Sequence, residues 1–255
     1  MIDDSPIVRQ VARAIDDAVS RVVQGPDSVG WNPGADIKRF REVRDQTLSI
    51  LGRLTDEQAT WSPRAGSWSI AEIADHLLLS EEIYRDQARR LLRKAEEGRG
   101  TVLEVSMDEM DVGIAGIPQD VVRVLEVPIR MFNLFVPNAV RETIVRYRIV
   151  SSLNPRSSQP RHGLILAQLK HDLSTALVQT EEFLAMPVPS NIDELTISHP
   201  VLGNNSLGQA FRMLIAHEER HHDQMARVES LEGFPKTSQE PMNAARMAEL
   251  FGSRK

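Results

Sequence analysis

The chain has 255 residues, of which 30 are Lys or Arg and 36 are Asp or Glu, and its net charge is −6. This acidic balance provides no basic face for nucleic acid, and the absence of cysteine excludes disulfides, a cysteine nucleophile and thiolate metal ligands. The acidic start of the sequence lacks the pattern of a signal peptide, and charges and prolines interrupt the longest apolar run, Val121 to Val140. We therefore expect a cytoplasmic protein with no membrane span and no nucleic-acid partner.

Helical periodicity governs the first part of the chain. Ser5 followed by Pro6 is typical of a helix start, and residues 1–30 are predicted to form an N-terminal helical extension. A turn-rich stretch then precedes a helix whose apolar stripe consists of Ile37, Phe40, Leu48, Leu51 and Leu54. Next, the sequence from Ser69 to Glu72 has the pattern of a capping box and predicts a long helix after it.

The rest of the chain contains an irregular stretch and two further long helices. Residues 97–160 show no clear period, although the apolar segment 121–136 is expected to line a pocket, to bury against a second subunit, or to pack on the outside of the helices. A helix is predicted over about Leu164–Ala185. A capping-box pattern at Ser206–Gln209 opens another helix, which ends near Leu231.

These elements predict an all-α fold. Residues 35–232 are expected to form an antiparallel four-helix bundle, because four long amphipathic helices have no convincing sheet on which to pack. The extra N-terminal helix and a long irregular middle connection would be added to this bundle. Residues 233–255 are predicted to form a C-terminal tail with a short peripheral helix.

The last long helix carries two histidines on its inward stripe. This stripe consists of Leu207, Ala210, Leu214, His217, His221, Gln224, Val228 and Leu231. The spacing of four residues places both imidazoles on one helix face, where two charged rings would repel each other. A divalent metal resolves this conflict, because it binds neutral imidazole. His76, on the inner side of the helix that follows Ser69, is the natural third ligand, although a lone inward histidine is more often a hydrogen-bonded core residue.

Four neighbouring residues are candidates for the surroundings of this metal. Gln224 lies one step along the stripe from His221 and could bond to it. His222 points about 100° away from His221 and is expected to flank the site or to support a ligand. His199 precedes a proline near the start of the last helix and could line the pocket. Glu72 could act as a base or hold a ligand, but its capping-box position explains it without any chemistry.

The stretch from His217 to His221 also matches the H-E-x-x-H motif of zinc peptidases. A zinc peptidase needs a third ligand downstream and a strand edge for the peptide. The only glutamates beyond the motif are Glu229, Glu232, Glu240 and Glu249, the last two in a polar tail, and no run of strands precedes it. Glu218 is expected to lie off the inward stripe of the helix. We therefore favour other chemistry over a peptidase, and expect the Glu218→Gln substitution to leave metal content and activity nearly unchanged.

Three stretches carry a family resemblance: WSIAEIADHLLLSEE at 68–82, HPVLG at 199–203 and AHEERHHDQM at 216–225. Together they resemble the DinB/YfiT-like superfamily of metal-dependent four-helix-bundle proteins, over about residues 35–232. The resemblance implies that His76, His217 and His221 are the metal ligands. It also implies up-down-down-up connectivity and a homodimer. The N-terminal helix and the long middle region depart from the usual pattern of the family.

The resemblance implies a divalent metal such as zinc, nickel or another first-row transition metal as cofactor. Characterised members are thiol-dependent transferases or isomerases, and some members are hydrolases. Because the chain has no cysteine, we expect a metal-dependent enzyme that acts on a small electrophilic substrate with an external low-molecular-weight thiol, or with metal-activated water. The alternative is a non-catalytic metal-binding or stress-related binding protein.

Overall fold

The computed structural model describes residues 30–64, 66–105, 158–199 and 203–236. This part of the chain is mostly helical, and its long elements are α2 (Pro33–Gly52), α4 (Ile70–Glu96), α7 (Leu166–Leu184) and α8 (Leu207–Glu229). A short helix, α3 (Asp56–Thr60), and a 3-10 turn, η2 (Ile192–Glu194), lie in the connections. Among the described residues, no helix is both long and apolar enough to cross a membrane.

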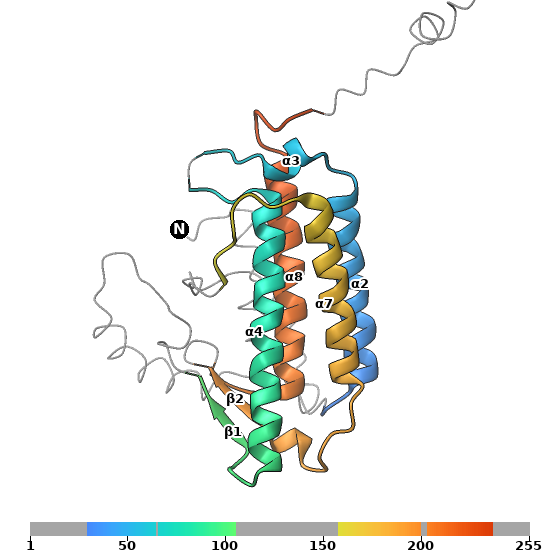
Figure 1. Cartoon of the computed structure of the whole chain (residues 1–255), viewed down its shortest axis with the longest axis vertical. Helices are drawn as coiled ribbons and strands as arrows, with labels where there is room; N and C mark the ends of the chain where they lie inside the picture. Colours follow the sequence, from blue (N-terminus) through green and yellow to red (C-terminus); the bar gives the residue numbers. More distant parts are fainter. Residues whose placement is uncertain (1–29, 65, 106–157, 200–202, 237–255) are drawn as a thin grey trace, which may run out of the picture.

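The four long helices lie side by side, and we call them the helical body (Figure 1). Helices α2 and α8 run upward in this view, whereas α4 and α7 run downward. Helix α2 packs against α7 and α8, and α4 packs against the same two helices. Helices α7 and α8 therefore each lie between α2 and α4.

The predicted helix starts at Ser69 and Ser206 are confirmed by their caps. The Ser69 side chain accepts a hydrogen bond from the backbone N–H of Glu72, and the Glu72 carboxylate accepts one from the backbone N–H of Ser69 at 2.8 Å. Ser206 accepts a hydrogen bond from the backbone N–H of Gln209 at the start of α8. These side chains satisfy N–H groups that have no partner within the first helical turn.

The all-α prediction did not include a small sheet that the structure contains. Strands β1 (Val102–Glu104), β2 (Thr196–His199) and β3 (Gly203–Ser206) form a small sheet in which β1 is parallel to β2 and β2 is antiparallel to β3. Strands of three or four residues are too short to show a period of two in the sequence. Their pairing also joins segments about ninety residues apart, as in the buried pair Leu103 and Ile197. The sheet lies at the end of the helical body where α4 ends and α8 begins (Figure 1).

Three predictions fall outside the described residues. They concern the N-terminal helix, the apolar segment 121–136 and the short helix of the C-terminal tail. Of that tail the structure describes residues 233–236, where the ring of Phe234 packs edge-on against Trp61 with centroids 5.6 Å apart.

Two apolar clusters fill the helical body. The cluster toward the sheet includes Val43, Ala88, Leu177 and Ile215. The cluster toward the other end includes Leu51, Leu78, Leu173 and Met225. Along the helices, the buried charged residues Arg44, Glu81 and Glu218 come between these two sets. The interior is therefore divided by a polar layer, and the candidate site lies at the level of this layer.

Candidate metal centre

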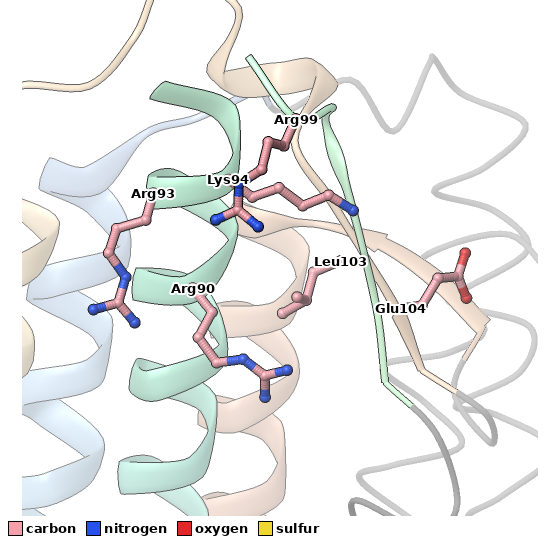
Figure 2. Close-up of a pocket in the computed structure, with 6 residues that line it drawn as sticks. All are labelled: Arg90, Arg93, Lys94, Arg99, Leu103 and Glu104. Atoms are coloured by element: carbon pink, nitrogen blue, oxygen red, sulfur yellow. The ribbon is translucent and has the colours of Figure 1, made fainter. Parts of the chain in front are cut away.

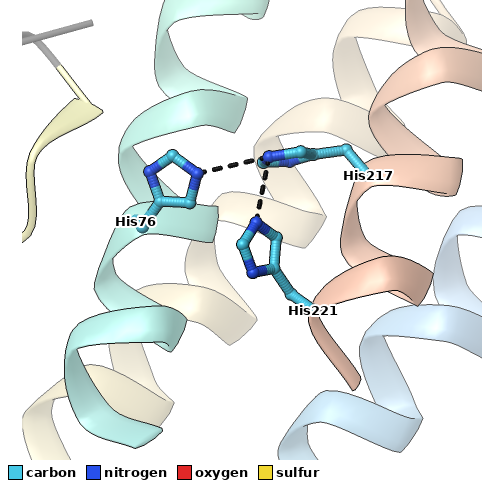
Figure 3. Close-up of side chains that lie close together, drawn as sticks. All are labelled: His76, His217 and His221. Atoms are coloured by element: carbon cyan, nitrogen blue, oxygen red, sulfur yellow. Dashed lines mark hydrogen bonds between the residues drawn. The ribbon is translucent and has the colours of Figure 1, made fainter. Parts of the chain in front are cut away.

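The imidazoles of His76, His217 and His221 meet between α4 and α8 (Figure 3). Nε2 of His217 lies 3.2 Å from Nε2 of His76 and 3.1 Å from Nε2 of His221. One ring nitrogen from each residue lies within 4.8 Å of the other two, and His76 and His221 are buried. The structure thus brings together the three predicted ligands as a group that could bind a metal ion.

Local geometry explains how two helices assemble this group. His217 and His221 are four residues apart on α8, so their rings lie one turn apart on the same face. His76 lies in the second turn of α4, which the capping box at Ser69 starts at a fixed residue. The indole of Trp68, just before that cap, packs against the His76 ring with centroids 4.9 Å apart.

Hydrogen bonds at the far side of two rings define their tautomers. Nδ1 of His76 lies 2.6 Å from the backbone carbonyl oxygen of Ser158, and Nδ1 of His221 lies 2.8 Å from Oε1 of Gln224. Both oxygens can only accept, so each Nδ1 carries the proton and donates. The Nε2 atoms of His76 and His221 therefore keep lone pairs, and both atoms face His217.

Burial keeps the imidazoles of His76 and His217 neutral. It lowers the pKa of His76 to about 4, against the ordinary value of 6.5. Burial, followed by the proximity of His221 and His76, lowers the pKa of His217 well below that value. A metal ligand must be the neutral ring, so no proton has to be displaced from these two residues near pH 7.

The donor set fits a divalent transition metal. Neutral imidazole nitrogens suit zinc, nickel and copper, and three of them without thiolate or carboxylate ligands leave coordination positions open for other molecules. Nη2 of Arg220 donates a hydrogen bond of 2.7 Å to Nε2 of His221, the same nitrogen that would face a metal. A bound cation would therefore have to displace this guanidinium contact.

The segment 158–162 closes one side of the centre, and sequence reasoning missed this. Besides the Ser158 carbonyl on His76, the backbone N–H of Arg161 donates to the buried carboxylate of Asp75 at 2.7 Å, and the Arg161 guanidinium pairs with the same group. Asp75 precedes His76, so this ion pair attaches the segment beside the ligand. The sequence offers a signal for Asp75, a charged residue within an apolar run, but none for a backbone carbonyl.

The other predicted neighbours have different outcomes. Gln224 contacts His221 directly, as described above. Glu72 forms the capping box, and its second carboxylate oxygen lies 2.9 Å from Nδ1 of the exposed His162. Nε2 of His222 lies 2.7 Å from Oγ1 of Thr47 on α2, so this residue flanks the centre. His199 lies in β2, where it pairs with Gly203 of β3, and is not part of the three-histidine group.

Glu218 does not lie where the sequence analysis expected it. The residue is 1% exposed, and it belongs to a regular buried stripe that consists of Leu207, Phe211, Leu214, Glu218, His221, Met225 and Val228. Leu231, which the expected stripe included, is 44% exposed. Apolar residues seven positions before and after Glu218, namely Phe211 and Met225, were the signal that could have placed it in the core.

A buried ion pair explains why a carboxylate is tolerated there. Nε and Nη2 of Arg44 each lie 2.8 Å from one oxygen of Glu218. Burial alone would lower the pKa of Arg44, but Glu218 and Glu81 outweigh it and raise that pKa. Burial alone would raise the pKa of Glu218, but Arg44 outweighs it and lowers that pKa. Both groups are therefore charged and paired.

This pairing argues against peptidase chemistry. The general base of an H-E-x-x-H peptidase must be directed at water beside the metal. Both oxygens of Glu218 instead accept hydrogen bonds from Arg44, and Oε1 also accepts one from Thr47. The motif match in the sequence does not correspond to a peptidase site.

A separate pocket of about 330 Å³ lies near the end of α4 (Figure 2). Its lining consists of Arg90, Arg93, Lys94, Arg99, Leu103 and Glu104. Lys94 donates to the carbonyl of Val102 at 2.6 Å, Arg99 pairs with Glu97, and cations in the last turn of a helix suit its exposed carbonyls. Arg90 comes fourteen residues after His76 on α4, about 21 Å along the helix. The pocket is therefore separate from the metal centre.

The fold and the three-histidine group together define a mostly helical protein with a candidate metal centre. The family model of the DinB superfamily matches residues 39–225, and the chain therefore belongs to the DinB superfamily. The match includes all three histidines. No curated protein and no solved structure matches the chain.

Proposed function

We propose that the chain is a metal-dependent enzyme that acts on a small electrophilic substrate, with His76, His217 and His221 as the metal ligands. One observation carries this proposal: three neutral imidazoles present one nitrogen each to a common point, and two of them are fixed from behind by Ser158 and Gln224. Such outer contacts orient metal-binding histidines and fix their tautomers. Membership of the DinB superfamily supports the same assignment.

We further propose that the helical body is an up-down-down-up four-helix bundle. The directions of the helices and their packing partners support this arrangement. It presents ligands from the second and fourth long helices to each other, so that the metal centre links two elements that are far apart in the sequence.

The chemistry we propose is thiol transfer, or hydrolysis by water. A metal held by three neutral imidazoles would act as a Lewis acid that favours the deprotonated form of a thiol or a water molecule. The chain has no cysteine, so a thiol nucleophile would have to be a separate low-molecular-weight compound. The protein groups exclude water from the far side of the rings, hold the Nδ1 protons on His76 and His221, and keep His217 neutral. The homodimer and the cytoplasmic location stay predictions.

The first experiment is metal analysis of protein purified without a histidine tag. We expect about one divalent metal per chain, and we expect it to be lost in His76→Ala, His217→Ala and His221→Ala variants. The exposed His171 provides a matched control, and His171→Ala should retain the metal. A wild-type protein that binds no zinc, nickel or cobalt would contradict the proposal.

The second experiment separates thiol transfer from hydrolysis. The metal-loaded protein is assayed with chlorodinitrobenzene and a panel of thiols, and in parallel with an activated ester without thiol. Thiol-dependent turnover that the His217→Ala variant lacks would support a transferase, and turnover of the ester alone would support a hydrolase. A metal-loaded protein inactive in both assays would favour the alternative of a non-catalytic metal-binding protein.

A further inference from the structure

One buried hydrogen-bond network takes side chains from all four long helices. Arg44 on α2 joins Glu218 on α8 to Glu81 on α4, with Nη2 of Arg44 also 2.8 Å from Oε2 of Glu81. Arg85 on α4 and Thr180 on α7 contact the other oxygen of Glu81, at 3.3 and 2.6 Å. We call these five residues the ion network.

The ion network is electrically balanced, although Nε of Arg85 is buried with no hydrogen-bond partner among the described residues. It contains two cations, Arg44 and Arg85, and two anions, Glu81 and Glu218. Nη1 of Arg44 donates to the backbone carbonyl of Leu173 on α7. Every network residue except Arg85, which is 3% exposed, has an exposed fraction of 1% or less. The network therefore contacts the backbone as well as the side chains of its neighbours.

Stability alone does not explain such a network. Removing charges from water is costly, and replacing a buried ion pair with apolar residues of similar size is often neutral or stabilising. Apolar clusters lie on both sides of this layer, so apolar side chains could continue the core through it. An ion pair also fixes the relative orientation of the two helices, since a bidentate pair forms only at one relative orientation of the two side chains.

The orientation of α8 matters because Glu218 lies between two candidate metal ligands in the sequence. It follows His217 by one residue and precedes His221 by three, which places it about 100° and about 60° from them around the helix axis. A rotation of α8 that separated Glu218 from Arg44 would turn both imidazoles away from His76. On the same face, Thr47 of α2 contacts both Glu218 and His222, and so joins α2 to this turn of α8 a second time.

We propose that the buried Arg44–Glu218 pair is a positioning device for the metal centre. It sets the rotation of α8 so that His217 and His221 face His76. This inference rests on the proposed function for its biological purpose, but its geometric content can be tested in metal-free protein. Glu218 acts here through the helix and does not touch the metal or the substrate.

The test uses the double variant Arg44→Met, Glu218→Met, which removes one charge of each sign and leaves Glu81 with Arg85 and Thr180. The matched control is Arg53→Met, Glu229→Met, because this pair also joins α2 to α8, at 2.8 Å, but is partly exposed near the helix ends. Two quantities are measured. Nuclear Overhauser effects between histidine ring protons report the position of the rings without metal, and a Co²⁺ titration reports affinity.

We expect the double variant to stay helical, to lose the ring contacts between His76 and His217, and to bind Co²⁺ about 10- to 100-fold more weakly, the range typical of lost supporting contacts. The control should keep both ring contacts and affinity. A folded double variant with wild-type ring contacts and wild-type affinity would overturn the positioning role. Wild-type protein that shows the ring contacts but binds no metal would contradict the proposed function. In that case the ring contacts of the double variant would still test the positioning role.

If the double variant does not fold, Glu218→Asp provides the second test. Aspartate keeps the charge but is one methylene shorter, so it reaches Arg44 only if α8 shifts toward α2. We expect weakened ring contacts and reduced Co²⁺ affinity at a nearly unchanged helical content. Unchanged contacts in this variant would overturn the inference.

Discussion

The ion network and the three-histidine group are neighbouring polar regions of one helical body, yet their charges are balanced in opposite ways. In the ion network two cations face two anions, and each carboxylate has partners. In the histidine group three imidazoles face one another, and Nδ1 of His76 and of His221 donates outward to a fixed acceptor. The first region pairs charges of opposite sign with each other, although Nε of Arg85 is buried with no hydrogen-bond partner among the described residues, whereas the second could bind a cation. The comparison teaches that neighbouring buried polar residues can differ in role: one set joins the helices to one another, and the other offers candidate metal ligands.

The largest expected effect comes from leaving one charge of the ion network unpaired. Arg44→Met leaves Glu218 buried without its cation, and loss of one partner of a buried pair costs about 3–5 kcal/mol. The double variant Arg44→Met, Glu218→Met should recover most of this loss, because no uncompensated charge is left. Urea unfolding in the presence of a chelator measures both. If the loss in the single variant is no more than that of an exposed pair, about 0–1 kcal/mol, the Arg44–Glu218 pair does not behave as a buried ion pair.

The second prediction uses pH to distinguish the two regions. In the unfolded chain His76 takes up a proton below about pH 6.5, whereas in the folded chain it does so only near pH 4. The unfolded state therefore binds more protons in this window, and His76 by itself should lower the stability of metal-free protein by about 3 kcal/mol as the pH falls from 6.5 to 4; the lowered pKa of His217 adds to this loss. The lowered pKa of Glu218 favours its charged form over the same range.

The measurement is unfolding as a function of pH with a chelator present. The His76→Leu variant should show a smaller slope between pH 6.5 and 4, because the residue that binds the proton is gone. An identical slope in wild type and variant would show that His76 is not the group responsible.

The third prediction concerns metal itself. A ligand that binds only the folded state at one hundred times its dissociation constant stabilises it by about 2.7 kcal/mol. Zinc at that excess should therefore raise the melting temperature of wild-type protein, and His217→Ala should abolish the increase. The variants of the ion network that still fold should show a smaller increase at the same zinc concentration. Equal increases in wild type and His217→Ala would place the zinc elsewhere.

The smallest effect is expected from the support of His221. Gln224→Ala removes the acceptor of the Nδ1 proton, so the ring loses its fixed tautomer, and we expect metal affinity to fall roughly tenfold. Gln168→Ala, which removes an exposed contact to Asp172 on α7, is the control. Circular dichroism should show both variants folded. Equal affinity in the two variants would mean that Gln224 does not support the ligand.

Local patterns in the sequence determined the main helices and two of the ligands. The capping residues Ser69 and Ser206 act within three residues of themselves, so their role can be read without knowing the fold. The spacing of His217 and His221 fixes their common face for the same reason. His76 could be proposed from its inward position on a separate helix. Only the folded chain shows that its Nε2 lies 3.2 Å from that of His217.

The tertiary structure alone decided which charged residues belong to the interior. A hydrophobic stripe is read from apolar residues, so Arg44 and Glu218 were assigned no core role, although both occupy buried helix positions. Their burial is tolerable only because each supplies the opposite charge to the other across 174 residues of sequence. The carbonyl oxygen of Ser158 that accepts a hydrogen bond from His76 likewise belongs to the backbone, so no residue type in the sequence indicates it. The geometry of residues on one helix turn follows from their spacing in the sequence. The free-energy cost of burying a charge instead depends on which groups the fold places beside it.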